Sequence, residues 1–123
     1  MEQLNRVELI GHVGEVRITP VGNAKVANFS VRTEFAYKTK DGQKVIETCW
    51  HKVSAWAQTE AAAKYLERIK PECPVKVSGR IKVRTFVRQD GAQASLHEIA
   101  ASRVEVLDGT AAPEGAGKMN AVV

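Results

Sequence analysis

The chain has 123 residues, 44% of them hydrophobic, which is enough for one domain to bury a core without disulfides or a structural metal. Its formal net charge is +4, and residues 1–107 carry 17 Lys and Arg against 12 Asp and Glu, so the excess positive charge lies on the expected domain. The sequence has no run of about 18 apolar residues and no apolar segment behind its first six residues, so we expect neither a membrane-spanning helix nor a signal peptide.

The first part of the chain alternates between apolar and polar residues, the pattern of half-buried β-strands. A first strand is expected over 5–14, where Gly11 and Gly14 favour the sharp bending that a small barrel requires. After a turn at 19–23, a second strand is expected over 25–37. Its apolar face holds Ala27, Phe29, Val31 and Phe35, and its opposite face holds Ser30 and Arg32.

A third strand is expected over about 44–56, after an Asp41-Gly42 hairpin turn. One face of this strand holds Cys49, His51, Val53 and Ala55, and the other holds Trp50, Lys52, Ser54 and Trp56. A buried sheet face rarely combines large aromatic side chains with an unpaired lysine. Rings beside a cation on an exposed face suit a flat anionic ligand, and single-stranded nucleic acid fits that description.

One helix is expected between 58 and 70, where the hydrophobic period changes to that of a helix. The residues that recur at i, i+3, i+4 and i+7 are Ala62, Tyr65, Leu66 and Ile69. Thr59 is the expected N-cap, and Pro71 is expected to end the helix.

A fourth strand is expected from about Val75 to Arg88, with its charged residues all on one face. The apolar face holds Val75, Val77, Gly79, Ile81, Val83, Thr85 and Val87, and the other holds Lys76, Ser78, Arg80, Lys82, Arg84, Phe86 and Arg88. A solvated face normally mixes both signs, because like charges two residues apart on a strand repel each other. This face has five cations and no carboxylate, so we interpret it as part of a groove that follows a nucleic-acid backbone.

A fifth strand is expected over 93–107, after an Asp90-Gly91 turn, and its apolar parity slips between Leu96 and Ile99, which suggests a β-bulge or an irregular stretch there. Residues 108–123 are rich in Gly, Ala and Pro without periodicity, so we expect a short flexible C-terminal tail after a domain at 1–107. The order of elements predicts an all-β protein, a five-stranded OB-fold Greek-key barrel with one helix between strands 3 and 4.

Several short motifs occur together along these elements. They are Asn5-Arg6-Val7, Val26 through Val31, Glu47-Thr48 with Trp50-His51-Lys52-Val53, Tyr65-Leu66, and Val77-Ser78-Gly79-Arg80-Ile81. In this combination, from Asn5 to about Leu107, the chain resembles the bacterial single-stranded DNA-binding protein family. The resemblance implies a cytoplasmic, nucleoid-associated protein that binds single-stranded DNA without sequence specificity during replication, recombination and repair.

The resemblance also implies which residues bind DNA. Bases would stack on four aromatic side chains, Trp50, Trp56, Phe86 and Tyr37. Tyr37 has the parity of the core residues, so its exposure requires twist or a bulge at the end of its strand. The cations expected to bind phosphates are Arg32, Lys52, Arg80, Lys82, Arg84 and Arg88.

Family members commonly assemble as homotetramers, and His51 matches a histidine that they place at a subunit contact. For His51 the alternative is a core histidine with its hydrogen bonds satisfied, and for the assembly the alternative is a dimer.

Typical cellular members end in a long linker and an acidic tip that recruits replication and repair enzymes. This sequence instead ends in Lys118 to Val123, without an acidic cluster or an aromatic residue. Recruitment through the tail is therefore in doubt. Two explanations of this ending remain open. One is a gene that comes from a plasmid, phage or other mobile element, and the other is a specialised paralogue.

Two other classes of function remain as alternatives. The first is an OB-fold accessory protein of replication restart that acts mainly through protein contacts. The second is an enzyme, since Cys49 and His51 share one strand face, but a small buried thiol beside an interface histidine explains the pair more simply. The two cysteines, Cys49 and Cys73, form no C-x-x-C motif and no zinc pattern, so we expect free thiols, no metal, no cofactor and no catalytic residue.

Overall fold

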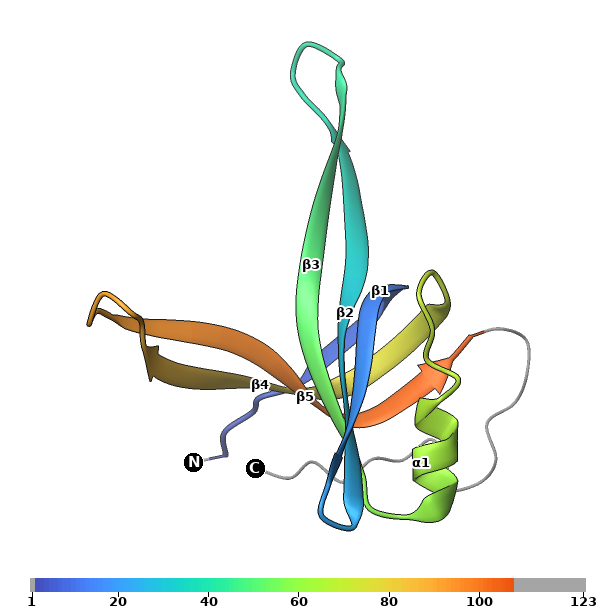
Figure 1. Cartoon of the computed structure of the whole chain (residues 1–123). Helices are drawn as coiled ribbons and strands as arrows, with labels where there is room; N and C mark the ends of the chain where they lie inside the picture. Colours follow the sequence, from blue (N-terminus) through green and yellow to red (C-terminus); the bar gives the residue numbers. More distant parts are fainter. Residues whose placement is uncertain (1, 108–123) are drawn as a thin grey trace.

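The computed structural model describes residues 2–107 as five strands and one helix. The elements are β1 (Val7–Val21), β2 (Ala24–Lys38), β3 (Lys44–Ala57), α1 (Glu60–Leu66), β4 (Pro74–Val87) and β5 (Gln93–Val106). The strands close into one barrel in the order β1-β2-β3-β5-β4 (Figure 1). All neighbouring strands are antiparallel except β3 and β5. The predicted all-β class, the strand number and the position of the helix are confirmed, whereas the expected tail at 108–123 lies outside the described residues.

The barrel core is formed by alternate apolar residues of all five strands together with α1 and the turn after it. Its largest fully buried side chains are Tyr65, Leu66, Ile69, Val13, Val31, Val75, Val77 and Val104. The Tyr65 hydroxyl accepts a hydrogen bond of 2.8 Å from the backbone N–H of Val106, which ties α1 to the end of β5. No helix within residues 2–107 is long and apolar enough to cross a membrane.

The helix is shorter than the sequence pattern indicates, but its cap is as predicted. Thr59 is the N-cap, and its hydroxyl accepts a hydrogen bond of 3.1 Å from the backbone N–H of Ala62. After Leu66 the backbone N–H groups bond to carbonyls three residues earlier, as in Ile69 to Leu66, so the chain continues as tight turns. These turns still place Ile69 in the core, which explains why the helical period extends beyond the helix.

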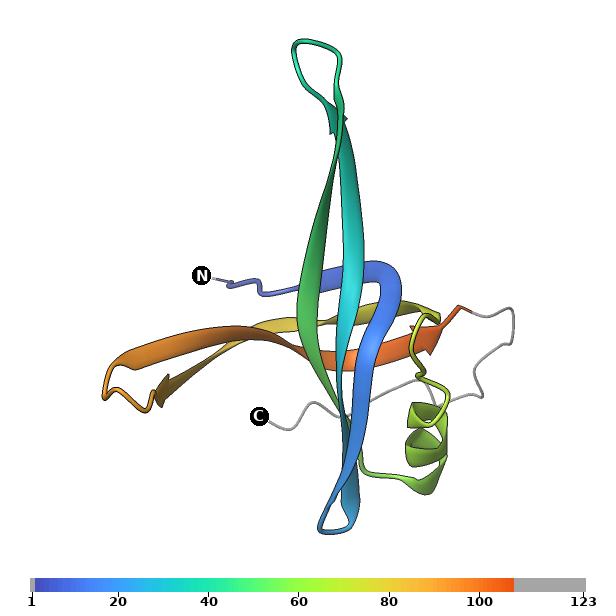
Figure 2. The same cartoon turned by 45° about the horizontal axis from the view of Figure 1, so that its top comes forward.

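β1 bends sharply and takes part in two different strand pairs (Figure 2). Its first half pairs with β4 over 7–12, and its second half pairs with β2 as far as Val21. The register with β2 shifts between Val13 and Val16, which is where Gly14 lies. The predicted bending of the first strand is therefore confirmed, but the strand continues to Val21, so the expected turn at 19–23 is narrowed to Gly22 and Asn23.

Two long hairpins extend away from the barrel, one formed by β2 and β3 and the other by β4 and β5 (Figure 1). We call them the β2–β3 arm and the β4–β5 arm. Both predicted Asp-Gly turns lie at their tips, where Gly42 and Gly91 have φ of 88° and 84°. A hydrogen bond from the Thr39 hydroxyl lowers the pKa of Asp41, and one from the backbone N–H of Ala92 lowers the pKa of Asp90.

Some residues predicted to lie in the core are exposed, because they lie in the arms and not in the barrel. Phe35 was expected to be buried but is 65% exposed, because the outer half of β2 lies in the arm, where no barrel covers it. The apolar face of β4 is likewise exposed along its arm at Ile81, Val83 and Val87. Tyr37 is 39% exposed without any bulge, since the register between β2 and β3 is unbroken from Lys25 to Lys38.

The irregularity in β5 lies further along than predicted. The register with β4 is continuous from Gln93 to Ala101 and shifts between Ser78 and Gly79, so Ser102 is the extra residue. The predicted bulge or irregular stretch between Leu96 and Ile99 is therefore wrong. Leu96 lies in the arm on the same face as Arg84, while Ile99 lies in the core, so their opposite parity needs no bulge.

Candidate nucleic-acid interface

Trp50 is the most exposed of the aromatic side chains on the barrel's outer face. It lies on β3 opposite Arg32 of β2, and 56% of its surface is accessible. The Arg32 guanidinium carbon lies 5.9 Å from the centre of its ring. A Cβ on Gly14 of β1 would lie only 2.5 Å from Trp50 Cζ3 and 2.6 Å from the Ser30 hydroxyl oxygen. Gly14 therefore makes room for the ring in its present position.

Trp56 and Lys52 continue the same face of β3. Lys52 is exposed opposite Ser30, and Trp56 is half-buried opposite Val26. The two tryptophans are six positions apart along the strand, a distance of about 20 Å. The structure thus places two rings on one face with a cation between them, as the alternation in the sequence predicts.

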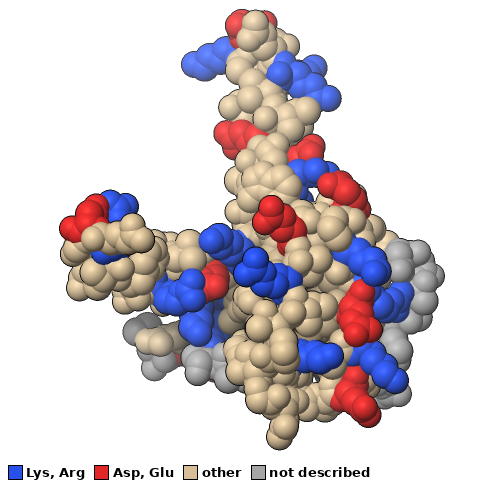
Figure 3. All heavy atoms as spheres, in the orientation of Figure 1, with Lys and Arg blue, Asp and Glu red and all other residues tan. Residues whose placement is uncertain are grey.

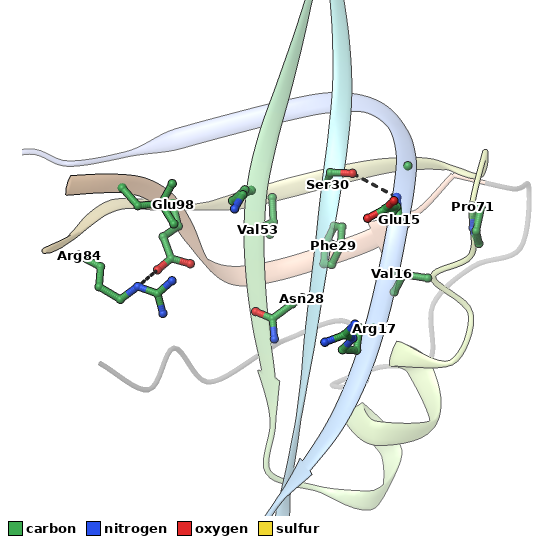
Figure 4. Close-up of a pocket in the computed structure, with 13 residues that line it drawn as sticks. Glu15, Val16, Arg17, Asn28, Phe29, Ser30, Val53, Pro71, Arg84 and Glu98 are labelled. Carbon is green, nitrogen blue, oxygen red and sulfur yellow. Dashed lines mark hydrogen bonds and ion pairs between the residues drawn. The ribbon is translucent and has the colours of Figure 1, made fainter. Parts of the chain in front are cut away.

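A groove of about 1060 Å³ lies beside this face, between the first three strands and the base of the β4–β5 arm (Figure 4). It is lined by Gly14, Glu15, Val16, Arg17, Asn28, Phe29, Ser30, Lys52, Val53, Pro71, Arg84, Leu96 and Glu98. Its three cations, Arg17, Lys52 and Arg84, come from three different strands. Sequence reasoning missed Arg17, because its place opposite Asn28 depends on the register that follows the irregularity in β1.

The β4 face has cations, as predicted, but it is not free of carboxylates. β5 supplies Glu98 directly opposite Lys82, and Arg84 Nε lies 3.3 Å from a carboxylate oxygen of Glu98. Glu105 of β5 lies opposite Lys76. The single sign of charge is therefore a property of β4 alone and not of the sheet face that β4 and β5 form together. The cross-strand neighbours depend on a pairing that periodicity does not reveal.

The remaining predicted cations differ in their surroundings. Arg80 lies opposite Ala100 near the closure of the barrel, and its Nη2 is buried without a hydrogen-bond partner among residues 2–107. β4 ends one residue earlier than expected, so Arg88 lies just beyond the strand, where it forms an ion pair of 3.2 Å with Asp90. Figure 3 shows Lys and Arg at the tip of the β2–β3 arm and near the base of both arms, with Asp and Glu among them.

Arg32 is held by two carboxylates as well as by the tryptophan ring. Its guanidinium lies 3.4 Å from Glu34 and 3.9 Å from Glu72. The backbone N–H of Glu72 donates a 2.7 Å hydrogen bond to the carbonyl of Val13, which fixes the segment before β4 against β1. Arg32 is therefore positioned beside Trp50 before any ligand arrives.

The other two predicted aromatic residues lie on the arms. Phe86 is 44% exposed on the β4–β5 arm, opposite Ala94 and on the same face as Arg84. Tyr37 lies on the β2–β3 arm with the parity opposite to that of Trp50, and its ring centre is 6.2 Å from that of Phe35. Two of the predicted rings thus share the outer face of β3, Phe86 lies on the β4–β5 arm, and Tyr37 lies on the other face of the β2–β3 sheet. Phe35, which the alternation in the sequence places on the core face, is also exposed on this arm.

His51 lies on the face of β3 opposite to Trp50 and is half-buried. Its Nε2 lies 2.8 Å from the hydroxyl oxygen of Thr33 on β2, within hydrogen-bonding distance. Both cysteines are free thiols, and Cys49 is exposed. Among residues 2–107, no group of three or more His, Cys, Asp or Glu side chains is placed to hold a metal ion.

Comparison with known proteins shows which protein family the chain matches. Residues 4–107 match the model of the single-strand binding protein family. A single-stranded DNA-binding protein of Neisseria meningitidis serogroup A is 37% identical over 110 residues, which cover 86% of this chain and 61% of that protein. One of Wolinella succinogenes is 30% identical over 115 residues, which cover 90% of this chain and 68% of that protein.

Solved structures agree with the fold. The structure of a Plasmodium falciparum SSB complex with single-stranded DNA matches with a TM-score of 0.76 and 24% identity, over 88% of this chain and 98% of that one. A single-stranded DNA-binding protein from Thermus aquaticus matches with a TM-score of 0.68 and 22% identity, over 95% of this chain and 54% of that one. At these identities the matches establish the fold of the barrel and no more.

Proposed function

The chain belongs to the single-strand binding protein family, and from this premise we propose that it binds single-stranded DNA without sequence specificity. In this proposal it coats and protects single strands at the nucleoid during replication, recombination and repair, as a binding protein without catalytic activity. The observation that carries the proposal is the face of β3, where exposed Trp50 and half-buried Trp56 flank Lys52 beside the cation-lined groove. The chain spans about 61% of the length of the Neisseria relative, so functions of the rest of such proteins are not transferred.

Binding would combine stacking with phosphate contacts. Each base stacked on an aromatic side chain contributes about 1–3 kcal/mol, and every base offers a flat face, so stacking requires no particular sequence. Phosphates would follow Lys52, Arg17 and Arg84 along the groove, and binding to Lys52 and Arg17 would release counterions. The arms would extend the contact through Tyr37 and Phe86, which are exposed at 39% and 44%.

Tryptophan fluorescence provides the direct test. Titration with a poly-pyrimidine oligonucleotide is expected to quench the fluorescence strongly, since both tryptophans of the chain lie on the proposed face. Binding is expected to weaken as the salt concentration rises. The slope of log K against log salt concentration is expected to be about −0.7 for each phosphate neutralised. A duplex of the same length is the control and is expected to quench little. No binding, or equal binding of both oligonucleotides, would contradict the proposal.

Assembly into a homotetramer is part of the proposal. β1 pairs with β4 over 7–12 and with β2 only from His12 onward, so among residues 2–107 the first half of β1 has one unpaired edge. Unpaired edges are ready templates for pairing with another chain. Exposed apolar side chains such as Ile10 and Val83 also favour burial against a second copy. His51 would lie at a subunit contact.

The mass in solution tests the assembly. Light scattering after size exclusion is expected to give four times the chain mass of 13.4 kDa. The measurement is made at several protein concentrations, because weak association would show itself as a falling mass on dilution. A stable dimer would contradict the tetramer and favour the accessory protein of replication restart. A monomer at all concentrations would remove the assembly from the proposal.

A further inference from the structure

One carboxylate is held inside the groove proposed to receive a polyanion. Glu98 lines the groove from β5, and its side chain is only 17% exposed. A carboxylate oxygen of Glu98 lies 3.3 Å from Nε of Arg84, and Figure 4 shows the two side chains pointing toward each other on one side of the groove. Directly across the strand pair, Glu98 also faces Lys82. Glu98 is therefore ion-paired with one cation predicted to bind DNA, Arg84, and lies across the strand pair from a second, Lys82.

The surroundings of Glu98 differ from those of the other acidic side chain in the groove. Glu15 is exposed on β1, and the charge of an exposed side chain is largely screened by solvent and salt. Glu98 is shielded from solvent and fixed by its ion pair, so its charge acts on anything that enters the groove. A phosphate that approaches Arg84 must therefore overcome repulsion from Glu98 or separate the pair.

We propose that Glu98 competes with DNA phosphate for Arg84 and so lowers the affinity of the groove for single strands. The inference rests on the proposed function. Because Glu98 already neutralises Arg84, this arginine contributes little to counterion release when DNA binds. A protein that must bind single strands and later give them up gains from such a competitor, since it weakens the complex without removing the cation that guides the strand.

A competitor and a positioning residue make opposite predictions. If Glu98 only oriented Arg84 toward a phosphate, loss of its charge would loosen the arginine and weaken binding. If it competes, loss of its charge frees Arg84 and strengthens binding. Glu98→Gln separates the two, since glutamine keeps the shape of the side chain and one oxygen acceptor but carries no charge.

The experiment compares E98Q with E105Q and the wild-type chain. Glu105 is a close match, because it lies on β5, is half-buried and faces a lysine, Lys76, but does not line the groove. Affinity for a poly-pyrimidine oligonucleotide is measured over a range of salt concentrations. E98Q is expected to bind roughly fivefold more tightly at low salt, with a salt slope steeper by about 0.7. E105Q, with the same change of net charge, is expected to change both quantities much less.

A third variant assigns the effect to Arg84. In an Arg84→Gln background, E98Q is expected to give a much smaller gain, since the cation that it would free is absent. Circular dichroism and urea unfolding check that each variant is folded. E98Q binding no tighter than E105Q, or more weakly than wild type, would overturn the inference while leaving the proposed function in place. Failure of the wild-type chain to bind single strands would overturn the proposed function, and this inference with it.

Discussion

Replacing both Trp50 and Trp56 by alanine is expected to weaken the binding of single-stranded DNA by at least about 30-fold. Each stacked base contributes ~1–3 kcal/mol, so the loss of two rings removes about 2–6 kcal/mol of binding free energy. The larger share is expected from Trp50, which is 56% exposed and lies beside Arg32. The double alanine variant has no tryptophan, so its binding is measured by the fluorescence anisotropy of a labelled oligonucleotide.

The matched control keeps the rings. Phenylalanine at Trp50 and Trp56 preserves a flat aromatic face, so this variant is expected to retain most of the affinity. Urea unfolding of the alanine variant is also needed, because Trp56 is half-buried opposite Val26 and its truncation removes packing as well as a ring. If the alanine variant is folded and binds as tightly as wild type, the two tryptophans are not the stacking platform.

The face that carries this prediction could be found from the sequence because it depends only on local alternation. Side chains two residues apart on a strand share a face whatever the strand pairs with, so Trp50, Lys52 and Trp56 were certain to lie together once the strand formed. Thr59 and the two Asp-Gly turns were equally local, since each signal depends on hydrogen bonds or backbone angles within a few residues. Such features need no knowledge of the barrel.

The errors arise where the surroundings of a strand change along its length. Phe29 and Phe35 have the same parity on β2, but the first lies in the barrel at 4% exposure and the second in the arm at 65%. Periodicity identifies a face but not the point at which the barrel ends. The same reason explains the exposure of Val83 and Val87 on β4, whose inner end contributes Val75 to the core.

The groove depends on strand pairing and was therefore the least predictable part. Glu98 lies 14 residues after Arg84 in the sequence, and only the register between β4 and β5 brings the two together. That register is interrupted at Ser78 and Gly79 by one extra residue, Ser102, which the sequence pattern did not locate. The charge of a sheet face is a property of neighbouring strands, so a count along one strand overestimated the positive charge.

Substitution of the glycine at this register shift is expected to have a large effect on stability. Gly79→Ala is expected to destabilise the barrel by about 4 kcal/mol or more, since its Cβ would lie 2.2 Å from the carbonyl oxygen of Ala100. It would also lie 2.9 Å from the Ala101 Cα, so the methyl group meets backbone and not a mobile side chain. Gly79 pairs with Val7 of β1 on its other side, so β4 cannot shift without disturbing the closure of the barrel.

Gly22→Ala is the matched control, because it adds the same methyl group without a clash. Gly22 has a φ of 59° and no atom within 4 Å of an added Cβ, so only backbone strain of about 1 kcal/mol is expected. For a domain of this size each kcal/mol corresponds to about 4–8 °C in Tm, so Gly79→Ala is expected to lower Tm by ~15 °C or more. Both variants and the wild-type chain are melted at equal chain concentration, since assembly raises apparent stability. Equal Tm values for the two variants would contradict the prediction. They would show that β4 and β5 can move apart at Gly79 and that their close approach at this residue is not needed for the stability of the barrel.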